Sequence, residues 1–424
     1  MTSEPREAFV WIWLPDAVDP VVAGRLDAVD DLVAFTYGRS YLERDGRIPL
    51  YLPELPLRRG QIVPLVGEVA GCIADAGPGA WGQRVILNRL VGSGAADTGD
   101  LPPLTYLLES DSDRTGALDF QVSPTEYVPR SRGEVQLSQL ASLAESARRV
   151  EEGIPLSPAL DEALLHGTSI GGARPKALLS DGKRRLIAKF SSTTDTFAVV
   201  KAEFVAMELA RRVGVDVAAV ELTEALGKDV LLVERFDRPA EGGRRALISA
   251  LTILDLGEWG GRYASYEALA DKIRERFTEP KATLRELFSR LTLNVLLGNT
   301  DDHARNHAAF WDGVALTLTP AYDICPLPRT GGEASQAMAI GRDGSRLSQV
   351  SSCVARASTF LLTQEEAREI VDGQIDTIER EWSDVCELAR LSEVDRRRLW
   401  RHAILNPYAT EGYSKLGRNK APSA

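Results

Sequence analysis

The side chains best suited to chemistry follow an apolar segment that begins near Asn294. That segment ends in a cluster of ionisable and amide groups, Asn299-Thr-Asp-Asp-His-Ala-Arg-Asn306. Asp301 and Asn306 lie five positions apart, and Asp323 follows seventeen positions later. An Asp and an Asn at this spacing serve phosphoryl transfer, because the aspartate accepts the proton of an acceptor hydroxyl and the asparagine holds a magnesium ion. A further carboxylate such as Asp323 completes the metal site, since Mg²⁺ prefers oxygen ligands.

Features upstream supply the other parts of such a site. Thr168-Ser-Ile-Gly-Gly-Ala-Arg-Pro-Lys176 is a glycine-bearing turn, and backbone N–H groups in such a turn approach phosphate oxygens closely. Lys189 lies in an apolar strand, where an ammonium needs an anionic partner, and Glu203 on the following helix is the natural counter-ion. The order of glycine turn, strand lysine, helix glutamate, catalytic aspartate and metal ligands is the order of parts in a protein kinase.

Between the two halves lies Leu231-Leu-Val-Glu-Arg-Phe-Asp-Arg238, which reads as a strand that leads into a charged turn. In a kinase-like fold this segment joins the lobes and holds the adenine. Backbone groups of Glu234 to Phe236 are then expected to bind the base, and Asp237 to reach the ribose.

The elements that position these residues differ between the two halves of the chain. Alternating apolar runs bounded by turn residues predict short strands, and 3.6-residue periodicity predicts helices. Strands are expected at 9–14, 48–52, 186–190, 217–222, 230–234 and 314–318, and helices at 85–90, 137–151, 199–213, 269–277, 284–297 and 365–391. The fold class is therefore α+β, a two-lobed protein-kinase-like fold with an N-terminal α/β part and a mainly α-helical C-terminal lobe. We expect an N-terminal subdomain over 1–135, a nucleotide-binding N-lobe over 136–250, a helical catalytic C-lobe over 251–413 and a disordered tail over 414–424.

Composition limits the partners and the compartment. The chain has 424 residues, 44% of them hydrophobic and 26% charged, and a net charge of −11, which repels nucleic acid and anionic membranes at long range. No apolar run reaches the roughly 20 residues needed to span a bilayer. The four cysteines are scattered, which is typical of a reducing compartment, so we expect a cytoplasmic protein without membrane contact.

Four motifs in this order resemble those of a known family. They are Ser169-Ile-Gly-Gly-Ala-Arg-Pro-Lys176, Val233-Glu-Arg-Phe-Asp-Arg238, Asn299-Thr-Asp-Asp-His-Ala-Arg-Asn306 and Pro320-Ala-Tyr-Asp-Ile324. With Trp81-Gly-Gln-Arg84 near the N-terminus, they resemble the HipA family of serine/threonine kinase toxins of type II toxin–antitoxin systems. The resemblance covers most of the chain.

The resemblance implies a role for each matching residue. Asp301 would be the catalytic base, Asn306 and Asp323 the magnesium ligands, and Ser169 the site of an inhibitory autophosphorylation. The nucleotide contacts would be Gly171, Gly172, Ala173, Arg174, Lys176, Lys189, Glu203, Glu234, Arg235, Phe236, Asp237, His303 and Tyr322, with Lys189 on the phosphates.

The resemblance also implies cofactors and partners. ATP and Mg²⁺ would be the cofactors, and a small HipB-like helix-turn-helix antitoxin the partner. DNA would be bound only indirectly, through that antitoxin. The protein substrate would be a cellular protein such as an aminoacyl-tRNA synthetase.

Several alternatives stay open at this point. Asp302 stands beside Asp301, so either acid is a candidate for the base, and Pro175 removes one N–H donor from the glycine turn. His303 and His307 have the spacing of a zinc pair, although the H-E-x-x-H pattern is absent. Two other functions compete with the protein kinase: a catalytically weak corepressor that acts with a helix-turn-helix antitoxin, and a small-molecule kinase of the same fold.

Overall fold

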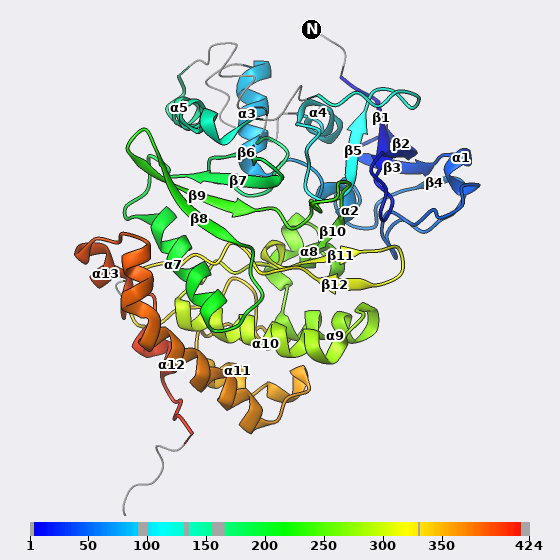
Figure 1. The fold of residues 1–424 in the computed structure, drawn as a ribbon. Coiled ribbons are helices and arrows are strands. Elements are labelled where there is room, and N and C mark those ends of the chain that lie inside the picture. Colours follow the sequence, from blue (N-terminus) through cyan, green and yellow to red (C-terminus); the bar gives the residue numbers. More distant parts are fainter. Residues whose placement is uncertain are drawn as a thin grey trace, which may run out of the picture. The chain divides into compact units, whose positions relative to one another are not determined.

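The computed structural model of the chain describes residues 4–91, 101–130, 135–154, 165, 167–329 and 331–416 (Figure 1). The chain divides into two compact units. The first unit comprises Met1–Thr194, Thr223–Gly257 and Ala309–Leu316, and the second comprises Asp195–Leu222, Glu258–Ala308 and Thr317–Ala424. This division differs from the predicted N-lobe over 136–250, because residues 195–222 belong to the second unit. The predicted domain boundaries themselves stay predictions.

The first unit begins with a five-stranded sheet of order β4-β3-β2-β1-β5, drawn in blue and cyan in Figure 1. Its neighbouring strands pair antiparallel, and most of β1 is buried, including Val10, Trp11 and Ile12. The strands are β1 (Glu7–Ile12), β2 (Val21–Val29), β3 (Leu32–Tyr37), β4 (Gln61–Ile62) and β5 (Leu118–Gln121). The helices around them are α1 (Arg39–Leu42), α2 (Gly71–Ala74), α3 (Ala80–Val91) and α4 (Pro103–Glu109).

A second sheet, of order β6-β7-β9-β8, carries the segments predicted to bind phosphate. One face packs on a core that includes Trp81, Leu143, Ala188, Phe190 and Leu232. Leu143 comes from α5, whose apolar residues lie on one face of the helix. The elements are η2 (Leu137–Gln139), α5 (Leu140–Glu151), β6 (Lys176–Asp181), β7 (Arg184–Phe190), β8 (Val220–Ala225) and β9 (Lys228–Glu234).

Three short strands form a third sheet, of order β10-β11-β12. They are β10 (Ala246–Ser249), β11 (Ala308–Trp311) and β12 (Leu316–Leu318), and the short helix α8 (Ala250–Ile253) follows β10. The Ser249 hydroxyl caps α8 by accepting a hydrogen bond from the backbone N–H of Thr252.

The second unit is mainly helical. Its α-helices are α7 (Val199–Arg212), α9 (Tyr266–Arg276), α10 (Pro280–Leu297), α11 (Val350–Val354), α12 (Gln364–Leu388) and α13 (Glu393–Leu399). The 3₁₀ helices are η3 (Glu258–Tyr263), η4 (Ala304–Asn306), η5 (Ala357–Phe360) and η6 (Pro407–Thr410). α7 and α12 lie side by side, and Arg212 of α7 pairs with Glu381 and Asp384 of α12 at 2.5 Å each (Figure 1). In the described part of the chain, no helix is both long and apolar enough to cross a membrane.

Most predicted elements with strong periodicity are confirmed. The helices expected at 85–90, 137–151, 199–213, 269–277, 284–297 and 365–391 and the strands at 9–14, 186–190 and 230–234 all appear, with ends that differ by a few residues. The strands expected at 217–222 and 314–318 are displaced or shortened to β8 and β12.

The strand predicted at 48–52 is wrong. The backbone of this segment bonds with aromatic side chains instead of a neighbouring strand: Tyr41 donates to Ile48 O at 2.7 Å, and Trp311 donates to Pro49 O at 2.9 Å. Pro49 and Pro53 flank the centre of the segment and cannot donate to a ladder. An apolar run interrupted by prolines therefore became a buried irregular segment.

The tail predicted to be disordered over 414–424 is ordered at its start. Lys415 Nζ lies 2.5 Å from Asp376 Oδ1, and the backbone N–H of Leu416 donates to Asp372 at 2.9 Å. Both acids belong to α12, so the acidic face of that helix holds the basic segment. Residues 417–424 lie outside the described residues.

Candidate functional site

The Asp301 loop (residues 299–307) is fixed in the second unit by the end of α10. Gly298 ends that helix in the left-handed conformation, with φ 70°, which glycine adopts without steric cost. The N–H of Asn299 then donates to Asn294 O at 2.9 Å, and its side-chain amide donates to Asn294 Oδ1 at 3.0 Å. A second segment holds the loop from its other side, since Ala337 N donates to Thr300 O at 2.9 Å.

Within the loop, Asp301 and Asn306 are brought together. The Asn306 side-chain amide donates to the backbone O of Asp301 at 3.4 Å, and the N–H of Asn306 donates to His303 O at 2.8 Å. The Asp301 side chain is exposed. The loop therefore presents a carboxylate to solvent and leaves the Asn306 amide oxygen as the atom that a cation would contact.

Asp302 has a different environment from Asp301. It is buried, it accepts a hydrogen bond from the Tyr266 hydroxyl, and its Oδ1 lies 3.0 Å from His307 Nε2. Tyr266 is the first residue of α9, which Ser265 caps by accepting from Ala268 N at 3.1 Å. Burial, and then the Asp302 carboxylate, raise the pKa of Tyr266 well above its ordinary value, so the phenol stays a neutral donor. Asp302 thus anchors the loop by buried contacts, whereas Asp301 is exposed.

Asp323 lies shortly after the end of β12, in a segment that contacts the Asp301 loop. The Tyr322 hydroxyl donates to Arg305 O at 2.7 Å, which ties the Asp323 segment to the loop. Asp323 itself has φ 60°, a left-handed conformation that a non-glycine residue adopts at a cost of about 1 kcal/mol.

The donor set fits magnesium better than zinc. Asn306 and Asp323 offer an amide and a carboxylate oxygen, the ligands that Mg²⁺ takes in phosphoryl-transfer sites. The zinc alternative loses support, because His303 is exposed while His307 is buried against Tyr266. Among the described residues, no group of three or more His, Cys, Asp or Glu side chains gathers as a structural zinc site would require.

In the first unit, two lysines share one face of the second sheet. Lys176 of β6 is the cross-strand partner of Lys189 of β7, and both side chains point away from the core to which Ala188 and Phe190 belong. Like charges directly opposite each other are destabilising in a sheet. A pair of lysines on one face is therefore suited to an anion that contacts both.

The glycine loop (residues 167–176) precedes β6 and exposes Gly171, Gly172 and Ala173 to solvent. Lys176 closes the loop, since its Nζ donates to Gly171 O at 2.5 Å. Gly172 has φ 95°, where only glycine is unstrained. A backbone that turns tightly with exposed amides is suited to phosphate oxygens.

The loop rests directly on the start of α3. Trp81 is fully buried, its N–H donates to Gly172 O at 3.1 Å, and its indole N–H donates to Lys176 O at 3.2 Å. A Cβ on Gly82 would lie 1.9 Å from Thr168 O, and one on Gly79 would lie 2.4 Å from Gly172 N. The glycines of this segment therefore permit backbone-to-backbone contact between the helix and the loop.

Ser169 is buried within this loop. Its hydroxyl donates to the backbone O of Asp113 at 3.0 Å, and the neighbouring Thr168 hydroxyl accepts from Asp111 N at 3.0 Å. The segment Asp111-Ser-Asp-Arg114 thus also holds the glycine loop, through the hydroxyl groups of Thr168 and Ser169.

The same segment holds the chain that follows β9. Arg235 pairs with Asp113 at 3.0 Å and with Asp237 at 2.9 Å, and Asp237 also accepts from Gly116 N at 2.8 Å and from Arg238 at 2.9 Å. Arg235 and Asp237 are buried. Their side chains belong to an ion cluster of Asp113, Arg235, Asp237 and Arg238, and the expected ribose contact of Asp237 stays a prediction. Glu234 and Phe236 are half-buried, and Phe236 packs edge to face on Phe310.

The cluster predicts a loss of stability in acid. Burial would raise the pKa of Asp237, but Arg235 and Arg238 outweigh it and lower the pKa to about 2, against an ordinary 3.8. A depressed pKa stabilises the fold above pH 4, and that contribution, on the order of 2 kcal/mol, is lost as the pH falls from about 4 to 2. Urea unfolding of Asp237→Asn should show a lower stability than the native chain at pH 7 and a smaller fall below pH 4. The exposed Asp45→Asn is the control, and an unchanged pH profile in Asp237→Asn would contradict the role given to the cluster.

The predicted site residues are divided between the two units. Asp301, His303, Asn306, Tyr322 and Asp323 belong to the second unit. Gly171, Gly172, Ala173, Arg174, Lys176, Lys189, Glu234 and Phe236 belong to the first. Lys189 and Glu203 fall in different units, so their predicted pairing stays a prediction; Glu203 is buried on α7.

Two functional positions were missed by the sequence analysis. Asp113 contacts both the glycine loop and the chain after β9, and Tyr266 holds Asp302. The charged run Asp111-Ser-Asp-Arg114 was a signal for the first. Nothing in the sequence indicates the role of Tyr266, because a tyrosine at the start of a helix is commonly an ordinary core residue.

The chain is similar to several known proteins. Residues 168–382 match the family described as HipA-like C-terminal domain. The chain is 25% identical over 323 residues to Y4mE of Sinorhizobium fredii, which is named as a candidate kinase, and the match covers 69% of this chain and 71% of that protein. It is 28% identical over 190 residues to the serine/threonine-protein kinase toxin HipA of Shewanella oneidensis, a match that spans 37% of this chain and 42% of the toxin.

A solved structure extends the likeness to nearly the whole chain. It contains HipA of Shewanella oneidensis with HipB and operator DNA, and it superposes with a TM-score of 0.68 over 95% of this chain and 98% of its own, at 20% identity. The likeness shows the fold, which confirms the predicted two-lobed kinase-like α+β class.

Proposed function

Because the chain belongs to the HipA family, we propose that it is a Mg-ATP-dependent serine/threonine protein kinase of a toxin–antitoxin pair. The observation that carries the proposal is the Asp301 loop, in which an exposed aspartate is tied to Asn306 while its neighbour Asp302 is buried as an anchor. A buried Asp302 leaves one carboxylate for proton transfer. This is the arrangement that phosphoryl transfer to a hydroxyl requires.

Each residue then has a chemical task. Asp301 orients the acceptor hydroxyl and takes its proton. Asn306 and Asp323 hold the magnesium ion, which neutralises charge on the transferred phosphoryl group. Lys176 and Lys189 contact the nucleotide phosphates with the exposed amides of the glycine loop, and the backbone at Glu234 and Phe236 holds the adenine.

Autophosphorylation at Ser169 is part of the proposal. The Ser169 hydroxyl is fully buried and bonded to Asp113 O, so it is closed to a phosphate donor while the glycine loop rests on α3. Modification therefore requires the loop to leave its seat. A phosphate on Ser169 would then hinder its return, because a dianion has no space in a buried hydroxyl position.

The partner is proposed from the solved relative. That structure contains HipB and operator DNA, so we propose a HipB-like antitoxin as the DNA-binding partner of this chain. The net charge of −11 supports this division of labour, since direct binding to DNA would be repelled. An aminoacyl-tRNA synthetase as substrate rests on the family resemblance alone.

The test is mass spectrometry of phosphatase-treated protein after incubation with Mg-ATP. We expect one phosphate per chain, located on Ser169, and none in Ser169→Ala. Phosphate transfer to a protein but not to a panel of small-molecule acceptors separates the protein kinase from a small-molecule kinase. Absence of both phosphorylation and nucleotide binding would contradict the proposal and favour the corepressor.

A further inference from the structure

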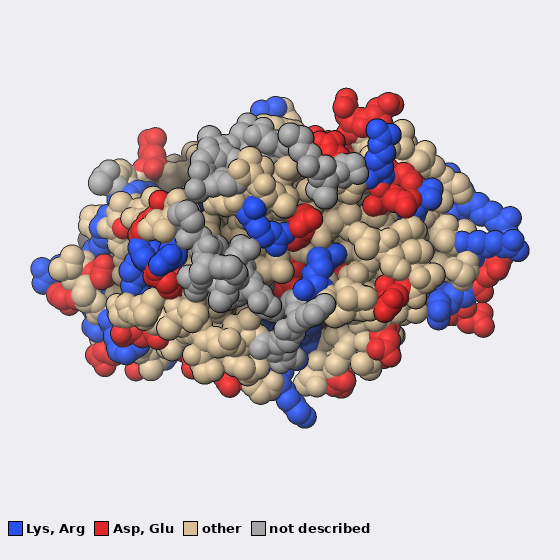
Figure 2. All heavy atoms as spheres, turned by 90° about the horizontal axis from the view of Figure 1, so that it is seen from above, with Lys and Arg blue, Asp and Glu red and all other residues tan. Residues whose placement is uncertain are grey.

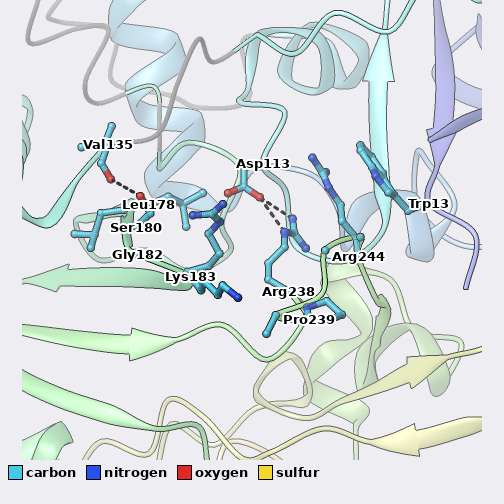
Figure 3. A pocket seen from close by; sticks show the side chains of 15 residues that line it. Trp13, Asp113, Val135, Leu178, Ser180, Gly182, Lys183, Arg238, Pro239 and Arg244 are labelled. Atoms are coloured by element: carbon cyan, nitrogen blue, oxygen red, sulfur yellow. Dashed lines mark hydrogen bonds and ion pairs between the residues drawn. The ribbon is translucent and has the colours of Figure 1, made fainter. Parts of the chain in front are cut away.

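A cavity of about 460 Å³ opens in the first unit (Figure 3). The β6–β7 hairpin, the loop at Asp113, the segment 238–244 and the Trp13 side chain line it. In the part of the chain that the structure describes, none of the residues predicted to contact nucleotide is among its lining residues. Its volume is within the range of small-molecule sites.

The walls of the cavity carry an excess of positive charge. Lys183, Arg185, Arg238 and Arg244 line it together with a single acid, Asp113. That acid is shared with Arg235, which lies 3.0 Å from it and does not line the cavity. The chain as a whole has a net charge of −11, so a cavity lined mainly by cations is unusual for it. On the face shown in Figure 2, by contrast, acidic and basic side chains are mixed.

Two of the guanidinium groups are held in place before any ligand arrives. Arg238 lies 2.7 Å from Asp113 Oδ1 and donates to Gly116 O at 3.1 Å. Arg244 donates to Ser112 O at 2.8 Å, and its guanidinium carbon lies 3.6 Å from the centre of the Trp13 ring (Figure 3). Groups that are fixed in this way lose little side-chain entropy on binding.

Burial and neighbouring charges both act on the pKa of Arg238. Burial, followed by repulsion from Arg235, lowers the pKa of Arg238 to about 10. Burial and Arg235 thus disfavour the protonated state, whereas Asp237 and Asp113 favour it, and an anion in the cavity would favour it further.

We propose that this cavity binds a small polyanion, a ligand with two or more adjacent phosphate or carboxylate groups. Arginine forks match the paired oxygens of phosphates and carboxylates, and Lys183 at the hairpin turn adds a mobile point charge. The site is a concave pocket of limited volume, which suits a small molecule better than a nucleic-acid helix. The ligand would bind beside Arg238, next to the ion cluster of Asp237, so its effect would reach the chain after β9.

The experiment is isothermal titration of the full chain with inorganic pyrophosphate and, separately, with citrate, both without magnesium. Lys183→Gln changes an exposed residue, and we expect it to weaken binding at least fivefold; adding Arg244→Gln should weaken it at least twentyfold. Arg59→Gln, an exposed cation outside the cavity, is the matched control and should bind as the native chain does. The two probes distinguish a phosphate ligand from a carboxylate ligand.

Lys189→Met distinguishes this site from the proposed nucleotide site. Pyrophosphate binding that survives in Lys189→Met and falls in Lys183→Gln supports the cavity, and it does so whether or not the chain is a kinase. Binding lost in Lys189→Met alone, or no binding of either probe, would overturn the proposal. If a glutamate hexapeptide binds more tightly than both probes, the cavity is a protein-docking site and the small-ligand proposal is wrong. The melting temperature of each variant without ligand checks that it is folded.

Discussion

Replacing Asp301 by asparagine is expected to lower the turnover of phosphoryl transfer by on the order of 10²-fold or more, the usual scale for the loss of a general base. The asparagine keeps the size of the side chain, and Asp301 is exposed, so the fold should be unaffected. Single-turnover phosphorylation with Mg-ATP, followed by mass spectrometry, measures the effect. Nucleotide affinity should change little, because the residue acts on the acceptor hydroxyl.

Asp302→Asn is the informative comparison. Asp302 is buried against Tyr266 and His307, so this variant should lower the melting temperature as well as the turnover. The melting temperature therefore distinguishes the two variants. Asp301→Asn should keep the native melting temperature, and Asp302→Asn should lower it. Near-normal turnover in Asp301→Asn, or equal stability losses in both variants, would contradict the assignment of the base.

The sequence was sufficient to predict the Asp301 loop because its information is local. Asp301 and Asn306 lie within one turn of chain after a periodic apolar helix, and the left-handed Gly298 marks where that helix ends. The same holds for α12, whose capping box at Thr363 and Glu366 and regular apolar face define a long helix. Local periodicity, helix caps and turn residues are therefore sufficient to predict the end of α10 and the extent of α12.

The ion cluster could not be predicted because its partners are far apart in the chain. Asp113 and Arg235 are separated by 122 positions, and neither residue type nor spacing indicates that they meet. The sequence predicts Arg235 and Asp237 as nucleotide contacts, and it gives no sign of their ion pairs with each other and with Asp113. Their burial, and the shared acid Asp113, are visible only in the packed structure.

The Gly79–Gly82 segment shows a similar limit. The motif Trp81-Gly-Gln-Arg84 was noticed for its resemblance, but no local rule explains a glycine inside a helix, where it costs about 1 kcal/mol relative to alanine. The explanation is a contact across the fold: Gly82 lies against the backbone of Thr168. The glycine is tolerated in α3 because it lets the glycine loop approach.

Gly82→Ala is accordingly expected to have a large effect on the first unit. The added Cβ would lie 1.9 Å from Thr168 O and 2.7 Å from Thr168 C, and both atoms are backbone that cannot rotate away. Overpacking of this kind costs roughly 1–3 kcal/mol or more in the free energy of unfolding, unless the glycine loop moves off α3. Hydrogen exchange and urea unfolding together measure both outcomes, since displacement would remove protection from the amides of residues 167–176.

Gly373→Ala is the matched control for this prediction. Gly373 lies inside α12, a Cβ there meets nothing within 4 Å, and alanine is the better helix former. That substitution should raise the free energy of unfolding by up to about 1 kcal/mol, while Gly82→Ala lowers it or releases the loop. If the two substitutions change the free energy of unfolding in opposite directions, the contact with Thr168, and not helix propensity, is the reason why position 82 requires glycine. If Gly82→Ala were as stable as the native chain with the loop still protected, α3 would not be the seat of the loop, and the buried state of Ser169 would need another cause.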